Sequence, residues 1–361
     1  MWDLAVREKD FQAVDSMLAR YRGSVPLSFR LVPARGRADV AVVTTLLDEA
    51  RALESRQLQL AARYTAAYLD DIDFADSLAR LDLAWRTRPA NRAQAQVQLG
   101  WIAVARGRWS DARRNFEQAE AMEGAGPVVI QAAFSATLPF LDPPREDLTT
   151  IRGKLANWNP ALEVSGEPTD PAATLRPHLR LQLLGLVSSK LDDRPAVMAY
   201  RDSLSRLPAP GGLEGVVRMM IATLDADRAY RDGDHQRVIR ILDGEVPVVP
   251  LELLALPRPA HVREYGFEHA RVLRGLSAAA LKNDSDAVRW LEHGLAGSPQ
   301  ELVYRAPVSL ELARIYERMG DNTRALERYE RAVRLWRHAD ADLRPLVEAA
   351  QQRVKALSGH P

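Results

Sequence analysis

The sequence predicts an all-α fold in which antiparallel helix pairs stack into an α-α superhelix. Three observations lead to this prediction. Distant segments share one pattern of small and large residues at equal offsets, a glycine often separates the two helical halves of a segment, and a proline often follows the second half. Length and composition agree with it, because 361 residues that are 47% hydrophobic and 27% charged are typical of a folded chain with one elongated repeat domain or a few globular domains.

The two clearest copies of the pattern lie at 93–126 and 305–337. In the second copy, Leu312-Ala313 is followed by Tyr316, Gly320, Ala325, Tyr329 and Ala332. In the first copy, Leu99-Gly100 is followed by Gly107, Ala112, Phe116 and Ala119 at the same offsets. Small residues let two antiparallel helices approach closely, and glycine suits the left-handed position that ends the first helix. We expect Phe116 and Tyr329 to fill the space toward the next pair.

Weaker copies occur in the rest of the chain. The copy at 179–208 contains Leu184-Gly185, Ala196, Tyr200, Ser203 and Pro208, which implies a turn one residue shorter. The copy at 216–250 contains Ala226, Gly233, Val238 and Leu242. Ala287, Leu291, Gly294 and Pro299 fit a second helix whose preceding helix is out of register. Phe11, Val14, Leu18 and Pro26 mark another second helix, and its first helix would be cut short by Met1.

The pattern resembles the tetratricopeptide repeat, in which leucine-glycine, tyrosine, alanine, phenylalanine and proline recur with a period of about 34 residues. The resemblance implies a solenoid of helix pairs. Arg337 stands where proline is usual, and most copies lack the first tryptophan, so the repeat is divergent. The alanine- and arginine-rich copies and the ending LWRHADADLRPLVEAAQQRVKAL also resemble the C-terminal repeat half of bacterial serine/threonine kinases and winged-helix transcriptional regulators. That second resemblance implies a sensor without its effector domain.

We predict four regions along the chain. They are an N-terminal arm (1–156), a proline-rich loop (157–177), a C-terminal arm (178–337), and a capping helix with a tail (338–361). The stretch 246–259 is a second interruption. Asp342 is expected to cap the last helix, whose apolar face carries Leu343, Leu346, Val347, Ala350, Val354 and Leu357. A half-polar helix can cover the end of a stack, so we expect the C-terminal end to be complete and the N-terminal end to be open.

Charge and composition disfavour several classes of function. The formal net charge is +1 and no basic run occurs, which argues against nucleic-acid binding. Cysteine is absent, which removes disulfides, thiol nucleophiles and cysteine metal sites. The start, MWDLAVREKDFQAVD, has no apolar signal region, and no run of 18 apolar residues occurs. We therefore expect a cytoplasmic protein that does not span a membrane.

No catalytic, cofactor or metal site is predicted. Glycine-rich phosphate loops, G-x-S-x-G and H-E-x-x-H are all missing from the sequence. His261 and His269 are eight residues apart, too far for one ion on a straight helix, and are interpreted as packing or surface residues. The acidic group Asp70, Asp71, Asp73 and Asp76 could be a cation site or an acid/base pair. We favour helix capping by Asp71 or Asp73.

The inner curve of the solenoid is the predicted binding groove. Trp101 directly follows Gly100 on the side of the first helix that faces this curve, and Val97 and Val104 share that side. Leu186, Met220 and Tyr230 are weaker candidates by the same register argument. Trp101 is either an anchor for a partner or a core residue, and the core interpretation is favoured because tryptophan is mostly buried.

Three functional hypotheses follow from these patterns. The first is a non-catalytic helical-repeat module that binds a protein or peptide in its concave groove, as the sensor or scaffold part of a bacterial regulatory protein. The second is an all-helical enzyme with an acidic cleft, such as a helical-toroid glycosidase, for which Asp70, Asp71 and Asp227 are the only nominated acids. The third is a scaffold that self-associates through its open N-terminal end.

Overall fold

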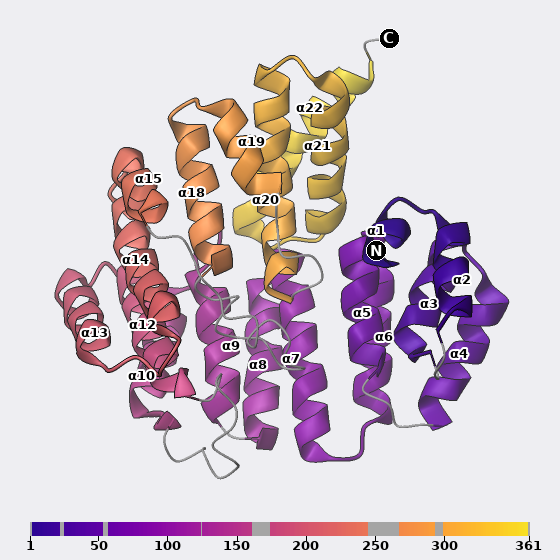
Figure 1. The fold of residues 1–361 in the computed structure, drawn as a ribbon, viewed down its shortest axis with the longest axis horizontal. Helices are drawn as coiled ribbons and strands as arrows, with labels where there is room; N and C mark the ends of the chain where they lie inside the picture. Colours follow the sequence, from indigo (N-terminus) through magenta and orange to yellow (C-terminus); the bar gives the residue numbers. More distant parts are fainter. Residues whose placement is uncertain are drawn as a thin grey trace. The chain divides into compact units, whose positions relative to one another are not determined.

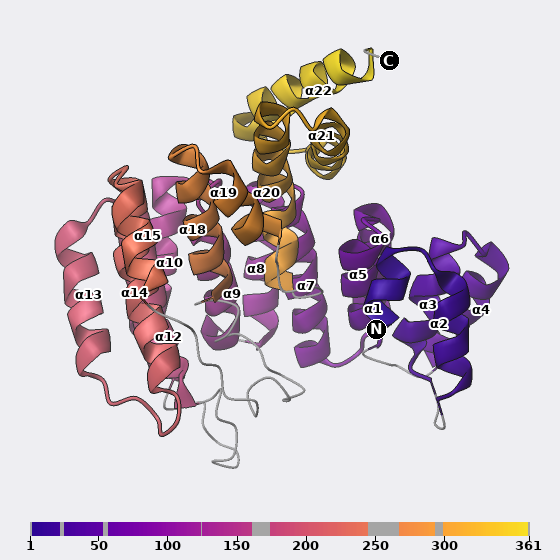
Figure 2. The same ribbon diagram turned by 45° about the horizontal axis from the view of Figure 1, so that its top comes forward.

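The computed structural model describes residues 2–21, 25–52, 57–123, 125–160, 174–244, 267–292 and 299–359. These residues form helices and turns with no strand among them, which confirms the predicted all-α helical-repeat fold. By its internal contacts the chain divides into two compact units. Unit 1 is Met1–Glu123 with Ala296–Val303, and unit 2 is Gly124–Leu295 with Tyr304–Pro361. Within each unit the helices lie side by side (Figures 1 and 2).

Unit 1 is built from four helix pairs. Its helices are α1 (Trp2–Arg7), α2 (Phe11–Ala19), α3 (Leu27–Gly36), α4 (Val40–Ala52), α5 (Gln57–Tyr68), α6 (Ile72–Trp85), α7 (Pro89–Ala105) and α8 (Trp109–Glu123). Each odd-numbered helix packs on the even-numbered helix that follows it, and α3, α5 and α7 also contact neighbouring pairs.

Unit 2 is also built from helices that pack in consecutive pairs. Its helices are α9 (Ala125–Thr137), α10 (Arg145–Asn157), α12 (Arg176–Lys190), α13 (Arg194–Arg206), α14 (Glu214–Arg231), α15 (His235–Asp243), α18 (His269–Ala280), α19 (Asp284–Glu292), α20 (Pro299–Arg318), α21 (Asn322–Trp336), the 3-10 turn η3 (Ala341–Leu343) and α22 (Arg344–Ser358). The start of α20 belongs to unit 1 by its contacts. No helix in the described ranges is both long and apolar enough to cross a bilayer.

A residue in the left-handed conformation ends the first helix of eight pairs in the described chain. These residues, with φ between 54° and 79°, are Lys9, Ala38, Asp70, Gly107, Asp192, Gly233, Lys282 and Gly320. The left-handed conformation predicted for Gly107, Gly233 and Gly320 is confirmed. The other five positions carry side chains, although glycine is the residue that adopts this conformation at least cost. A search for glycine therefore finds fewer than half of the turns.

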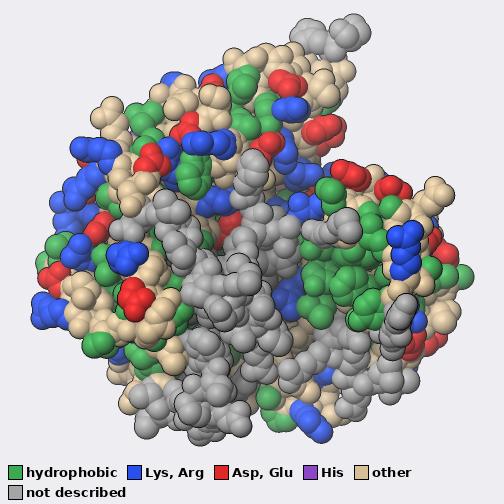
Figure 3. Space-filling view, in the orientation of Figure 1, with side chains coloured by type: hydrophobic (Ala, Val, Ile, Leu, Met, Phe, Trp, Pro, Cys, Tyr) green, Lys and Arg blue, Asp and Glu red, His purple; other side chains and the backbone are tan. Residues whose placement is uncertain are grey.

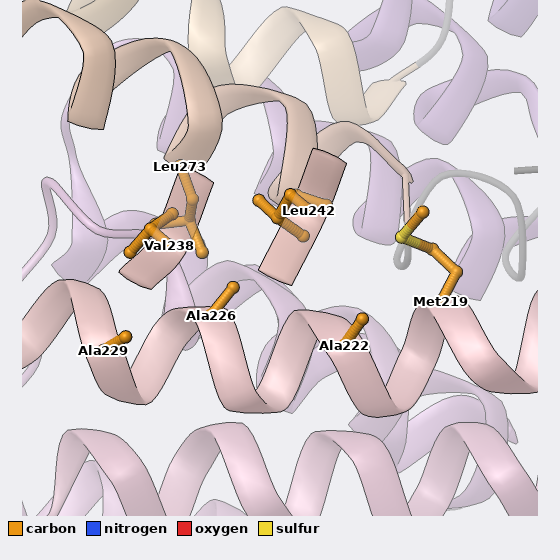
Figure 4. Close-up of a cluster of buried hydrophobic side chains, with 8 residues drawn as sticks. Met219, Ala222, Ala226, Ala229, Val238, Leu242 and Leu273 are labelled. Atoms are coloured by element: carbon orange, nitrogen blue, oxygen red, sulfur yellow. The ribbon is translucent and has the colours of Figure 1, made fainter. Parts of the chain in front are cut away.

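The residues after each left-handed position repeat as well. In six pairs the next residue is an aspartate that accepts a hydrogen bond from the backbone N–H three residues later, namely Asp10, Asp39, Asp71, Asp193, Asp234 and Asp321. Such caps satisfy backbone donors at the start of the second helix. The fifth residue after the left-handed position is buried and is always alanine or valine. In α15 this residue is Val238, which lies over Ala226 and Ala229 of α14 (Figure 4).

This repeat corrects the predicted register of the copy at 179–208. Asp192 follows Gly185 by seven residues, as Gly107 follows Gly100, so the turn is not shorter. Val197 and Leu204 are therefore the buried residues of α13, at 4% and 0% exposure, and not Ala196 and Ser203. Arg201 correspondingly takes the place predicted for Tyr200. The prediction was wrong because an aspartate, and not a glycine, occupies the left-handed position.

The helix before α19, which is α18, also follows the register of the repeat, contrary to the prediction. A Cβ atom added to Gly275 would lie 2.6 Å from Cδ2 of Leu291, sixteen residues later. At the same offset, a Cβ atom on Gly100 would lie 2.5 Å from Cε1 of Phe116. Phe116 thus packs over Gly100 of its own pair, where we had expected it to fill space toward the next pair. Glycine is needed at both positions because a ring or a leucine occupies the space of its side chain.

Several other predictions concern the chain between and after the pairs. Most of the predicted loop 157–177, all of the interruption 246–259, and Gly294 lie outside the described residues, so the boundaries of the two arms stay a prediction. Asp342 does not cap the last helix: α22 begins at Arg344 with Leu343 as its N-cap residue, and Asp342 lies inside η3. Val347 and Ala350 form the buried part of α22.

Candidate binding surface on the first helices

Residues on the first helices can be compared through one reference position, the residue seven places before the left-handed turn. The reference residues are Trp2 in α1, Leu31 in α3, Arg63 in α5, Gly100 in α7, Gly185 in α12, Ala226 in α14, Gly275 in α18 and Ala313 in α20. Residues at three before, one after and four after the reference share one side of a helix, because they are three or four residues apart. This is the side for which the sequence predicts a groove.

Four of the six predicted groove residues are buried in the structure. Trp101 and Leu186, each one after its reference, are 4% and 1% exposed, and Val104 and Met220 are fully buried. Val97 and Tyr230 are half-buried. The burial of Trp101 agrees with the core interpretation. Whether any of the six contacts a partner stays a prediction.

Unit 1 contains an aromatic cluster that was not predicted. It consists of Trp2, Phe29, Tyr64 and Tyr68, all half-buried, from α1, α3 and α5. The ring centroids of Trp2 and Phe29 are 4.6 Å apart, and that of Trp2 is 5.8 Å from the centroids of both tyrosines. Tyr64 is one after its reference residue, at the position of Trp101 in α7. Figure 3 shows hydrophobic side chains gathered over α1, α3 and α5.

Arg7 stands at the edge of this cluster. Its guanidinium carbon lies 5.2 Å from the centroid of the Tyr68 ring, within the range of a cation–π interaction. The side chain is exposed, and within the described part of the chain it forms no ion pair. Other arginines of unit 1 do pair, as Arg35 does with Asp71 and Arg106 with Asp73. The cluster thus joins a half-buried aromatic surface to an exposed arginine that has no ion-pair partner among the described residues.

In unit 2 a polar chain crosses four first helices, and it was also not predicted. Asp227 of α14 accepts hydrogen bonds from Ser189 of α12 at 2.7 Å and from Arg231 at 3.0 Å. Its other carboxylate oxygen lies 3.3 Å from Nε2 of His269 in α18. Nδ1 of that histidine lies 2.8 Å from the hydroxyl oxygen of Tyr304 in α20. The side chains of Asp227 and His269 are 1% and 0% exposed.

The pKa values of the groups in and near the polar chain are shifted in different directions. Burial by itself would raise the pKa of Asp227, but Arg231, His269 and Ser189 outweigh burial and hold this pKa below its ordinary value. Burial raises the pKa of Tyr304 well above its ordinary value. Burial also lowers the pKa of nearby Lys190 to about 8, with a contribution from Arg231. The carboxylate is therefore the stable charge of the group, whereas a general acid would need a raised pKa.

A register signal for the polar chain was present in the sequence. Asp227 is one after its reference, the position of Trp101 and Leu186, and Ser189 is four after its reference, the position of Val104. His269 is six before its reference, the position of Met220. We nominated Asp227 only as an acid for an enzyme, because polar residues at these positions were not compared between copies.

The acidic group at 70–76 is explained by helix capping and ion pairs. Asp71 caps α6 by accepting from the Phe74 N–H at 3.0 Å, which confirms the capping interpretation. Asp76 bonds to Arg80 at 2.8 Å, and Asp70 is the left-handed residue of the turn. Across the described ranges, no three His, Cys, Asp or Glu side chains are grouped as metal ligands. His269 packs in the core, and His261 lies outside the described residues.

Comparison with known proteins supports the repeat interpretation for one segment. The tetratricopeptide-repeat family model matches residues 309–338, which cover the second half of α20 and the whole of α21. This segment contains Ala313, Gly320 and Ala325, and it belongs to one of the two clearest copies of the pattern. A search among curated proteins finds no match. The match and the all-helical fold together describe a tetratricopeptide-like protein.

Proposed function

We propose that this protein is a non-catalytic interaction module that binds a protein or peptide on the inner side of its first helices. Tetratricopeptide-type repeats are in general interaction modules, and the match at 309–338 supports that class. The observation that carries the proposal is the aromatic cluster of unit 1. Apolar patches that stay partly open to solvent often mark binding sites, and tyrosine and tryptophan are typical anchor residues of interfaces.

A paired capture experiment tests this proposal. Wild-type protein and a Tyr64→Ser, Phe29→Ser variant are immobilised, and bound proteins from source-cell extract are quantified. We expect at least one protein to bind the wild type and to be lost from the variant. Val42→Ser is the matched control, since Val42 is 42% exposed on the second helix α4, away from the cluster. An identical set of captured proteins in all three samples contradicts binding at the cluster.

We further propose that the module serves a bacterial regulatory protein, as its sensor or scaffold part. The support is the resemblance of the repeats and of the C-terminal sequence to the repeat halves of such regulators. An immunoblot of source-cell extract tests it. A native polypeptide far above 40.2 kDa supports a module joined to an effector domain, whereas a band at 40.2 kDa argues for a separate module.

Self-association is a second candidate, favoured by the exposed apolar residues of the first pair. Leu4 of α1 is 55% exposed, and Tyr21, shortly after α2, is 58% exposed. Light scattering at rising protein concentration tests it, and a constant monomer mass contradicts it. The acidic-cleft enzyme has less support, because Asp227 has a lowered pKa and is bound to Arg231.

A further inference from the structure

We infer that the aromatic cluster of unit 1 takes an acidic peptide segment, in which a large apolar side chain sits on Tyr64 and its neighbours and a nearby carboxylate pairs with Arg7. The inference rests on the proposed function and specifies the chemistry of the partner. Two independent features of the cluster support it, namely its apolar surface and the charge at its edge.

The apolar part of the surface fixes one requirement on the partner. Half-buried rings of Trp2, Phe29, Tyr64 and Tyr68 form the cluster, with centroids of neighbouring rings 4.6 to 6.1 Å apart. The rings contact one another, so they present a continuous surface and not an open cage. One large aliphatic or aromatic side chain laid on this surface would remove apolar area from water, at about 25 cal/mol per Å².

The charge at the edge fixes a second requirement. Arg7 is exposed, has no ion-pair partner within the described chain, and lies over the face of Tyr68. No acidic residue occupies the neighbouring inner positions of α5 and α7, which are Leu60, Tyr64, Val97 and Trp101. A carboxylate brought there gains a charge-assisted, bidentate partner without displacing an internal ion pair. A basic segment would place like charges together.

The geometry also limits the spacing of the two groups in the partner. The guanidinium carbon of Arg7 is 5.2 Å from the centroid of the Tyr68 ring. Alternate side chains of an extended peptide lie on one side and are about 7 Å apart, at a rise of roughly 3.3 Å per residue. In an extended partner, the carboxylate and the apolar anchor are therefore two positions apart in the sequence.

Selection of peptides on the full-length protein tests the inference. A phage-displayed library of random peptides is selected against the wild type, Arg7→Gln and Arg20→Gln. Arg20 is an exposed arginine at the end of α2 and is the matched control. We expect peptides selected on the wild type and on Arg20→Gln to carry Asp or Glu two positions from a large apolar residue. On Arg7→Gln the acidic preference should be lost and the apolar preference kept.

Affinity measurements on the best peptide complete the test. Fluorescence anisotropy should show a threefold to tenfold weaker Kd for Arg7→Gln, a smaller dependence on salt, and no change for Arg20→Gln. Selection of apolar peptides without acidic residues overturns the inference but leaves the proposed function standing. Failure to select any peptide above an unrelated control protein contradicts both. Equal selection on a correctly folded Tyr64→Ser variant also overturns the inference, because the peptide then binds elsewhere.

Discussion

Replacement of Asp227 by alanine tests how much the polar chain contributes to stability. The change leaves the N–H of His269 and the hydroxyl of Ser189 without an acceptor in the interior, and each unpaired buried group costs about 1–3 kcal/mol. The Arg231 side chain is 24% exposed and can be partly rehydrated, so its lost ion pair adds about 0–1 kcal/mol. We therefore expect Asp227→Ala to lower the free energy of unfolding by about 3–5 kcal/mol, as found when buried pairs lose one partner.

Urea denaturation followed by circular dichroism measures this loss, with Asp225→Ala as the matched control. Asp225 lies on the same helix and pairs with Arg201, but both side chains are about one-third exposed, so we expect a loss of about 0–1 kcal/mol. If the two variants lose equal stability, the polar chain is not a net contributor and the reasoning fails.

The stability difference between the wild type and Asp227→Ala is expected to depend on pH. The folded-state pKa of Asp227 is depressed below 3.8, so its carboxylate stabilises the fold above that value. As pH falls below 3.8 and toward the folded pKa, this contribution is lost. The difference between the wild type and Asp227→Ala should be constant from pH 5 to 7 and should shrink in stronger acid.

Four further substitutions have expected effects on the free energy of unfolding, measured in the same assay. Gly100→Leu should lower the free energy of unfolding by about 1–3 kcal/mol, because the new side chain overlaps the Phe116 ring. Gly153 is exposed within α10 and has open space around it, so Gly153→Ala should raise the free energy of unfolding by about 0.5–1 kcal/mol. Gly320→Ala, at φ +79°, should cost about 1–2 kcal/mol, and a neutral result would mean that the turn can change conformation. Burial depresses the pKa of Lys190 from 10.5 to about 8, so between these pH values the unfolded chain binds more protons than the folded chain. The free energy of unfolding should therefore rise by about 1–2 kcal/mol from pH 8 to 9.5. In Lys190→Met this rise should be absent.

Where the sequence pattern depends on helix geometry alone, it predicted the structure well. Glycine at 107, 233 and 320 marked real left-handed turns, and Ala112 and Ala325 are fully buried at the predicted crossings. These features are local, since the conformation of a turn and the spacing of a helix face depend on residues within a few positions. Asp192 shows the limit of this reasoning, because a turn held by packing on both sides can accept an aspartate at a glycine position.

The candidate binding surface depended on contacts that local pattern does not specify. The aromatic cluster combines residues from three helices, and the polar chain combines residues from four, so neither is a motif in one stretch of sequence. Register comparison could place Asp227 and Tyr64 on the inner side of their helices, but not Arg7 over Tyr68 or His269 between Asp227 and Tyr304.

The sequence by itself determined the all-helical fold and the glycine turns at 107, 233 and 320, because these follow from a period of 3.6 residues and from the needs of a left-handed turn. Only the tertiary structure decided which inner-side residues are in the core and which remain at the surface. Trp101 and Tyr64 occupy the same register position, yet the first is buried and the second half-exposed. That difference depends on the helices packed around each residue.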